Sequence, residues 1–176
     1  MLVNARITNR ELDICEEGTT MNIGTTGKQA IPLQDCSDAR KADVLRSLRM
    51  VGADRYDLLL PETHSLPHLL APDEQLLGAV YGKYTLDKGT HVSRGLMAIT
   101  DRRILLVDKK PFFMLYNDIS FDVVAGIAYG ETGLGETVTL STRMGDIRFR
   151  TFNPACASRF VQAVEDKLFN KEGEPS

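Results

Sequence analysis

Residues 95–108 read Gly-Leu-Met-Ala-Ile-Thr-Asp-Arg-Arg-Ile-Leu-Leu-Val-Asp. Two apolar runs, Gly95–Thr100 and Arg103–Asp108, flank a polar break that is short enough for a tight reversal of the chain. Asp101 in that break can cap a turn, and Arg103 can pair across it. A turn between two strands therefore explains Thr100, Asp101 and Arg103 without any catalytic role. The pattern predicts a β-hairpin.

Similar apolar segments continue on both sides of this hairpin, separated by turn signals. Pro111 cannot continue a central strand, the pair Asn117-Asp118 favours a turn, and Gly145 suits a hairpin reversal. The further predicted strands are Gln75–Tyr84, Phe112–Tyr116, Ser120–Ala128, Glu136–Thr142 and Asp146–Phe152. We therefore expect a mainly β fold of the α+β class, with a seven-stranded antiparallel barrel or sandwich.

After the last strand the apolar period changes from two to 3.6 residues. Asn153 is a favourable N-cap, and Pro154 suits the first helical position because its missing N–H costs nothing there. One apolar stripe follows, formed by Ala157, Phe160, Val161, Val164 and Leu168. The spacing predicts a C-terminal helix that ends near Asn170 and caps the sheet, with residues 171–176 as a polar tail.

The first 72 residues form an N-terminal extension with a different pattern. Residues 3–7 alternate as in a half-buried strand, and residues 18–26 form a loop rich in Gly and Thr. A helix is predicted from Ser37 to Val51, with Ala42, Leu45 and Leu48 facing inward. Residues 58–71 contain two prolines and are expected to be a connector with one short helical turn.

The predicted strands differ in the polarity of their two faces. In the last hairpin Arg148 and Arg150 alternate with apolar residues, so one face of this hairpin is exposed to solvent. In the middle of the sheet both faces are apolar, and something must cover the outer one. Either the N-terminal helix or a second copy of the chain could do so. The candidate interaction surface comprises Leu105, Val107, Phe113, Leu115, Arg148 and Arg150.

Composition excludes several classes of protein. The 176 residues are 43% hydrophobic and carry 21 basic and 24 acidic side chains, which argues against a general nucleic-acid binder. No apolar stretch approaches the length of a membrane span, and no signal peptide is evident. Three widely spaced cysteines indicate free thiols, so we expect a cytoplasmic protein.

Motifs for nucleotide, metal or catalytic chemistry are weak. Residues 24–28 (Gly-Thr-Thr-Gly-Lys) have only part of a phosphate loop, because Gln29 replaces its Ser or Thr. His64 and His68 are four residues apart, but Pro67 should start any helix near Ser65–Pro67 and leave His64 outside it. No enzyme signature is present. We expect no enzyme, cofactor or metal.

Basic residues suggest one ligand site. Lys83, Lys88 and Arg94 bracket the loop between the first two strands. A solvated face accounts for such charges, and so does a site for a lipid headgroup or an acidic peptide.

The order of motifs in residues 73–170 resembles the bacterial pleckstrin-homology (PH) domain family. Glu74 opens the first strand, the Thr-Asp-x-Arg hairpin follows at residues 100–103, and Asp118-Ile119 enters a later strand. The resemblance implies a PH-like barrel and a non-enzymatic scaffold that binds a protein partner or associates with itself as a homo-oligomer. Its alternative implication is a module that binds anionic lipid headgroups at the first hairpin loop. The basic pattern of lipid-binding relatives is only partly met, since Val92 replaces one basic residue.

Overall fold

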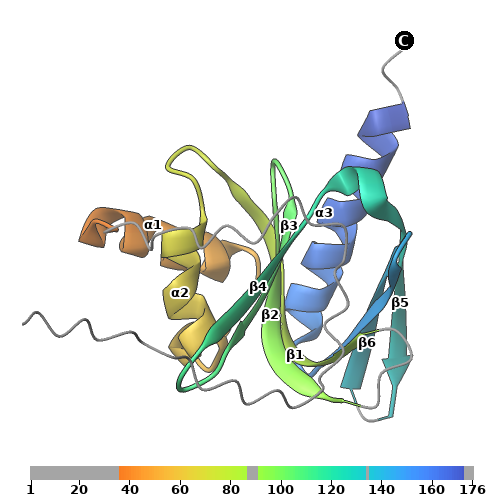
Figure 1. Ribbon diagram of the computed structural model, residues 1–176, viewed down its shortest axis with the longest axis horizontal. Helices are drawn as coiled ribbons and strands as arrows, with labels where there is room; N and C mark the ends of the chain where they lie inside the picture. Colours follow the sequence, from red (N-terminus) through yellow and green to blue (C-terminus); the bar gives the residue numbers. More distant parts are fainter. Residues whose placement is uncertain (1–35, 87–90, 134, 173–176) are drawn as a thin grey trace, which may run out of the picture.

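The computed structural model describes residues 36–86, 91–133 and 135–172, which form one seven-stranded antiparallel sheet with helices outside it (Figure 1). The strands are β1 (Leu76–Leu86), β2 (Ser93–Thr100), β3 (Ile104–Lys109), β4 (Met114–Ile119), β5 (Val124–Thr132), β6 (Gly135–Thr142) and β7 (Gly145–Thr151). The helical elements are α1 (Asp38–Met50), the short 3₁₀ helix η1 (Asp57–Leu59), α2 (Pro61–Leu69), the 3₁₀ helix η2 (Phe121–Val123) and α3 (Pro154–Glu172).

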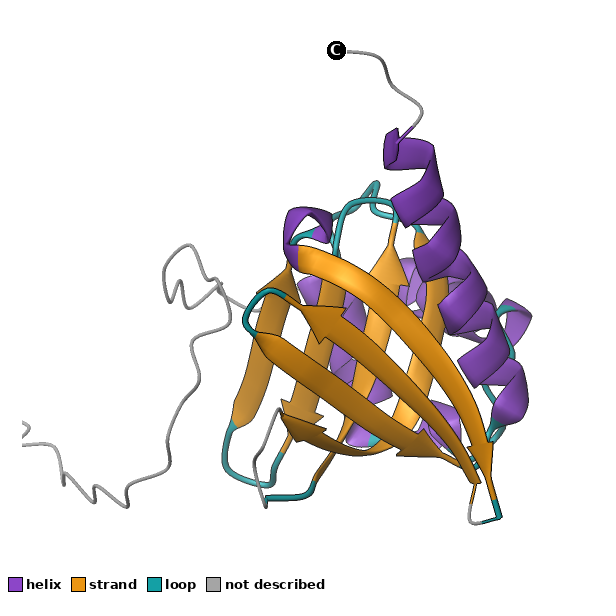
Figure 2. Cartoon of the chain, turned by 90° about the vertical axis from the view of Figure 1, so that its right-hand side faces the viewer, coloured by secondary structure: helices purple, strands orange, loops and turns teal. Residues whose placement is uncertain are grey.

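The sheet curves around an apolar core that α3 closes from the side (Figure 2). The strands are ordered β4-β3-β2-β1-β7-β6-β5, so the long strand β1 joins the first half of the sheet to the last. The inner core comprises Val80, Met97, Ile104, Leu106, Val138, Leu140, Ile147 and Phe149 from the strands, and Ala157, Phe160 and Val164 from α3. The predicted seven strands and the C-terminal helix are therefore confirmed.

Gly82 lies where β1 begins to pair with β7. A Cβ atom at this position would lie 2.1 Å from the carbonyl oxygen of Arg150, so only glycine permits the close approach of the two strands. The pairing that follows places Lys83 opposite Arg150.

Two boundaries in the middle of the chain differ from the prediction. Asn117 and Asp118, predicted as a turn, lie in β4, where they pair with Leu106 and Leu105 of β3. The predicted fifth strand begins later, at Val124, because the hydroxyl of Ser120 accepts a hydrogen bond from the Asp122 amide and caps η2. The reversal of the chain therefore occurs three residues later than the polar pair suggested.

The N-terminal helix is confirmed, and the segment after it is more helical than predicted. Ser37 caps α1 by accepting from the Arg40 amide at 3.2 Å, but Val44, not Ala42, shares the buried side with Leu48. α2 runs through the predicted connector and contains both histidines. Pro61 suits its first turn, and Pro67 lies within the helix and is buried. The prediction that His64 lies outside a helix was wrong. The predicted strand at residues 3–7 and the Gly/Thr-rich loop lie outside the described residues.

The outer face of β1, β2 and β3 is covered by the chain's own helices. Leu105 and Val107 are both 0% exposed and pack with Leu48 of α1 and Leu66 of α2. The two apolar faces inferred from the sequence are thus confirmed, and the cover in this region is the N-terminal extension. The same packing corrects the proposed interaction surface, because Leu105 and Val107 are not accessible to a partner.

An ion-pair cluster around the buried carboxylate of Glu74 joins this cover to the sheet. Arg103 donates from Nε to Oε1 of Glu74 and from Nη2 to Oε2 of Glu74, both at 2.9 Å. It also donates to the carboxylate of Asp118 in β4 and, at 3.0 Å, to the carbonyl oxygen of Leu69 at the end of α2. The Thr100 hydroxyl donates to Glu74 Oε1 at 2.8 Å. One guanidinium thus holds α2, the start of β1, the β2–β3 turn and β4 together.

Leu48→Ala should lower the free energy of unfolding by about 2–5 kcal/mol, because it opens a cavity between α1 and the outer face of the sheet. Leu59→Ala is the matched control, since its side chain is 67% exposed. It should change the free energy by less than about 0.5 kcal/mol. Urea denaturation measures both, and equal small effects would show that α1 does not serve as a structural cover.

Glu74→Gln should lower the free energy of unfolding by about 3 kcal/mol at neutral pH, because it leaves Arg103 partly buried without its main partner. Burial alone would raise the pKa of Glu74, but hydrogen bonds from Arg103, the Ala71 amide and Thr100 outweigh it and hold the pKa below the ordinary 4.5. The charged carboxylate therefore stabilises the native state fully above that value, and the contribution disappears as pH falls through the native pKa. Denaturation from neutral pH to about pH 3 should show the two proteins converging. A constant difference would refute this account.

Candidate functional site

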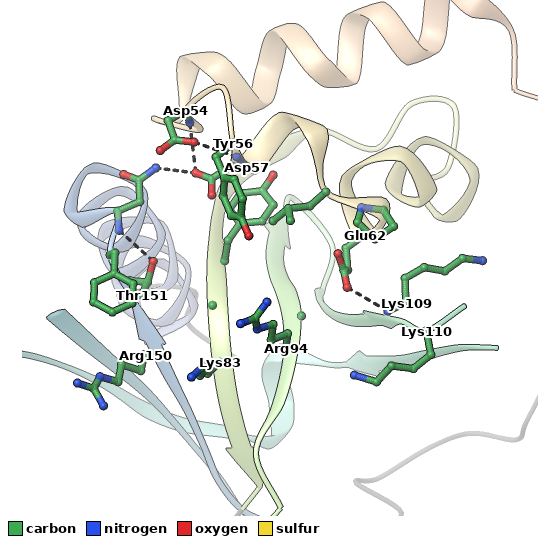
Figure 3. Close-up of a pocket in the computed structure, with 17 residues that line it drawn as sticks. Asp54, Tyr56, Asp57, Glu62, Lys83, Arg94, Lys109, Lys110, Arg150 and Thr151 are labelled. Carbon is green, nitrogen blue, oxygen red and sulfur yellow. Dashed lines mark hydrogen bonds between the residues drawn. The ribbon is translucent and has the colours of Figure 1, made fainter. Parts of the chain in front are cut away.

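A cleft of about 680 Å³ opens between the N-terminal cover and the outer face of the sheet (Figure 3). Its floor comes from β2, β1 and β7, at the part of the outer face that α1 and α2 leave uncovered. Its roof is the segment Asp54–Glu62, which includes η1 and the start of α2. Phe152 and Asn153, which precede α3, close one end.

Three cations lie side by side on the floor. Arg94 of β2 is paired with Lys83 of β1, and Lys83 is also paired with Arg150 of β7, so the three side chains occupy one row across three strands. All three are exposed, and Figure 3 shows them along the same side of the cleft. We call Arg94, Lys83 and Arg150 the basic row. Lys109 and Lys110 line the cleft beyond β2.

The carboxylates of the roof are engaged elsewhere. Asp57 Oδ2 accepts from Asn153 Nδ2 at 2.7 Å and from the Asp54 amide at 3.2 Å. Asp54 Oδ1 in turn accepts from the Asp57 amide at 2.8 Å, and Glu62 Oε1 accepts from the Lys109 amide at 3.3 Å. Burial raises the pKa of Asp57 despite its hydrogen bonds. The roof is therefore held to the sheet and to α3 by its own acidic groups.

No ion pair joins Lys83 or Arg94 to a carboxylate among the residues that the structure describes. Like charges on directly opposed strand positions destabilise a sheet. Carboxylate or phosphate oxygens are the groups that such cations can bind. The residues of the floor therefore have the chemistry to bind an anion.

Two aromatic side chains flank this floor. Tyr56 of the roof is 65% exposed, and Phe152, which follows β7, is 79% exposed. Large exposed aromatic residues beside cations are typical of surfaces that bind a partner, because they supply apolar contact at a low cost in conformational entropy. The cleft can therefore hold a ligand that is both anionic and partly apolar.

The structure brings together residues that the sequence placed in separate sets. Lys83 and Arg94 were predicted as one anion site, and Arg150 was assigned to another surface, but strand register puts all three in one row. Lys88 lies outside the described residues. Arg148 is on the same face of β7 as Arg150, lies outside the cleft, and pairs with Asp146 at 3.5 Å.

Phe113 and Leu115 lie apart from the cleft. They belong to the β3–β4 corner and to β4 at one edge of the sheet, and they are 56% and 52% exposed. Sequence reasoning missed the roof and Lys109. Lys109 continues the alternation of Leu105 and Val107 along β3, so strand period could have placed it on the outer face. No comparable signal links Asp57 to Asn153, which are far apart in the chain.

Catalytic and metal-binding arrangements were also sought in the described part of the chain. No cluster of three or more His, Cys, Asp or Glu side chains suited to a metal occurs in it. Glu62 points to the Lys109 amide and does not join His64 and His68. Burial raises the pKa of the Cys156 thiol to about 12, which suits a core residue better than a nucleophile. The phosphate-loop-like segment at residues 24–28 lies outside the described residues. Of the described helices, none is long and apolar enough to cross a membrane.

The antiparallel barrel closed by a C-terminal helix defines a PH-like fold, a class whose members are typically non-catalytic binding modules. The profile of the bacterial PH domain family matches residues 70–166, more than half of the chain, and the protein belongs to that family. No curated protein matches the sequence.

Two of the solved structures that resemble the chain contain PH domains by their descriptions. The Vps36 N-terminal PH domain has a TM-score of 0.48 and 19% identity, and the match covers 60% of this chain and 86% of that one. A DUF1696 family protein with a pleckstrin-homology domain, from Shewanella loihica, has a TM-score of 0.33 and 14% identity, covering 60% and 87%.

Lys83→Thr should raise the free energy of unfolding by up to about 1 kcal/mol at low salt, because it removes both like-charge pairs of the basic row. The gain should shrink at about 0.5 M salt, where exposed charges are screened. Arg148→Thr is the matched control: its cross-strand neighbours are Thr85 and Thr139, and it has an acidic partner. It should show no gain. Denaturation at two salt concentrations measures both, and identical behaviour would mean that the row is not under electrostatic strain.

Proposed function

We propose that this protein is a non-enzymatic binding module that acts through protein–protein interaction, with an acidic segment of a partner protein docking in the cleft. One observation carries the proposal: three cations stand in register on the floor while the nearby carboxylates are committed to hydrogen bonds of the roof. Tyr56 and Phe152 add apolar contact at the flanks.

The shape of the site favours a protein segment over a flat surface. The roof overhangs the basic row, which hinders a flat bilayer from reaching the three cations. An extended chain can enter beneath the overhang with its carboxylates toward the floor, because the roof carboxylates Asp57 and Glu62 are buried and hydrogen-bonded.

Binding to an anionic membrane is the second candidate, and it rests on a different part of the surface. Phe112 is 97% exposed and Phe113 is 56% exposed at the β3–β4 corner, one residue beyond Lys109-Lys110. Exposed aromatic side chains beside lysines suit the interface of a bilayer containing anionic lipids. The first hairpin loop, with Lys83, Lys88 and Arg94, is the alternative contact for anionic headgroups that the sequence suggests.

We also propose self-association, through a smaller surface than the one predicted from the sequence. Leu105 and Val107 are buried, so a second copy would have to use the edge strand β4, where Leu115 and Phe113 are exposed. The unpaired edge of a sheet is a template for pairing with another strand.

The double variant Lys83→Glu/Arg94→Glu should bind a labelled peptide of alternating Glu and Leu at least about tenfold more weakly than the unaltered chain, because two attractive charges become repulsive. Arg143→Glu/Arg148→Glu changes the net charge equally outside the cleft lining and should bind almost normally. Fluorescence anisotropy at several salt concentrations measures affinity and its salt dependence.

Vesicles of phosphatidylcholine with about one-fifth phosphatidylserine separate the second candidate from the first. Co-sedimentation that is lost on Phe112→Ala/Phe113→Ala, without peptide binding, would favour the membrane. Light scattering of the same samples reports the oligomeric state, and Leu115→Glu should reduce any dimer. Equal peptide affinity for both charge-reversal variants would refute docking at the basic row.

A further inference from the structure

The side chain of Asn153 contacts two separate parts of the molecule. Its Oδ1 accepts a hydrogen bond from the Cys156 amide at 3.1 Å and so caps the first turn of α3. Its Nδ2 donates to Asp57 Oδ2 at 2.7 Å and to the carbonyl oxygen of Gly52 at 3.0 Å, so it holds both ends of the segment 52–57. We propose that Asn153 is a positioning residue of the cleft, which fixes the roof where Tyr56 can contact a docked partner.

The roof residue that Asn153 holds is the chain neighbour of a residue that faces the cleft. Asp57 is 5% exposed, whereas Tyr56 is 65% exposed and lines the cleft. Figure 3 shows both residues above the floor. The inference rests on the proposed function, because it gives Tyr56 a contact with the docked partner. Since that contact requires the aromatic ring to stay close to the floor, the position of Asp57 decides whether the ring can make it.

The other hydrogen bonds of this turn serve a different purpose. Asp57 Oδ2 also accepts from the Asp54 amide, and Asp54 Oδ1 accepts from the Asp57 amide. The Thr63 hydroxyl of α2 donates to the carbonyl oxygen of Asp57 at 2.6 Å. These bonds keep the shape of the turn and join it to α2. The two donations from Asn153, which we call the anchor, join it to the start of α3 at the end of the cleft.

Loss of the anchor would leave a buried carboxylate short of hydrogen-bond donors. An ionised carboxylate has several acceptor sites, and burying it without donors is costly in free energy. The turn can avoid this cost by moving outward until water reaches Asp57. Because Tyr56 precedes Asp57 directly, the same movement takes its ring away from the floor. The anchor therefore determines how well the roof contributes to binding, although Asn153 itself need not touch the partner.

Asn153→Ser separates the cap of α3 from the anchor. Serine is as good an N-cap as asparagine, but its hydroxyl has one proton and is one bond shorter, so it cannot make both donations. Circular dichroism should show an intact fold, and the labelled Glu–Leu peptide should bind about fivefold more weakly. Gln162→Ser, on the exposed side of α3 and outside the cleft lining, is the matched control and should bind normally.

A double-variant comparison distinguishes positioning from a general loss of structure. Tyr56→Ala should weaken peptide binding by a similar factor, and Tyr56→Ala/Asn153→Ser should bind no more weakly than Tyr56→Ala alone, because both changes remove one contact. In Lys83→Thr/Asn153→Ser the two factors should multiply, because Lys83 acts from the floor. Factors that also multiply for Tyr56 and Asn153 would overturn the proposal, as would an unchanged affinity of Asn153→Ser.

The position of the roof can also be measured without a peptide. The chain contains no tryptophan, so Tyr56→Trp introduces a single indole fluorophore at the residue that faces the cleft. In this background Asn153→Ser should lower the fluorescence anisotropy of the indole and raise its quenching by acrylamide, because the turn is released. Gln162→Ser should change neither quantity. Equal anisotropy and quenching with and without Asn153→Ser would overturn the proposal.

An exchange of the two side chains provides the second variant. Asn153→Asp keeps the cap but places a carboxylate against Asp57, so it should release the indole at least as much as Asn153→Ser does. Asn153→Asp/Asp57→Asn again puts a donor opposite an acceptor, and it should return anisotropy and quenching most of the way to their starting values. A release that this exchange does not reverse would mean that the anchor is not the cause.

The peptide measurements separate failure of this inference from failure of the proposed function. If affinity depends on Lys83 and Arg94 while Tyr56→Ala and Asn153→Ser bind normally, the proposed function stands and only this inference fails. If the unaltered chain binds no acidic peptide, the proposed function fails, and the role of Asn153 in binding fails with it.

Discussion

The guanidinium of Arg103 is the contact on which the remaining arrangement depends. It donates four hydrogen bonds, to Glu74, Asp118 and the carbonyl oxygen of Leu69, so the segment 69–74, the β2–β3 turn and β4 meet at one side chain. Lysine could not replace it, because the bidentate geometry to Glu74 requires a planar fork. This contact anchors the end of α2, the helix whose first residues belong to the roof, although Arg103 itself does not line the cleft.

Much of the fold could be predicted because its elements follow local rules. Alternation of apolar residues identified the strands, and Asn153-Pro154 identified the start of α3. The errors occurred where tertiary contacts outweighed local preference. Asp118 looks like a turn residue, yet the ion pair with Arg103 keeps it in β4. Pro67 looks like a helix breaker, yet it lies near the end of a short helix and is buried against its surroundings. For Asp118 the deciding partner is 15 residues away in the sequence.

Only the part of the candidate site that depends on local sequence could be predicted. Lys83 and Arg94 could be grouped because they flank one hairpin loop, and a hairpin brings its flanks together. Arg150 joins them only through the pairing of β1 with β7, which depends on the close approach at Gly82. The roof could not be predicted at all. It is held by the hydrogen bond between Asp57 and Asn153, and the helix-start pattern at Asn153-Pro154 gives no indication of that distant partner.

The two walls of the cleft have different origins in the chain. The floor residues Lys83, Arg94, Lys109 and Arg150 lie inside the region matched by the bacterial PH family, whereas the roof, residues 54–62, precedes it. The extension covers an apolar face that would otherwise be exposed, and where this cover ends it leaves a basic row beneath an overhang. One segment therefore supplies both the apolar cover of the outer face and the roof of the cleft. The family domain contributes the basic floor, and the cleft exists only because the extension that precedes this domain overhangs it.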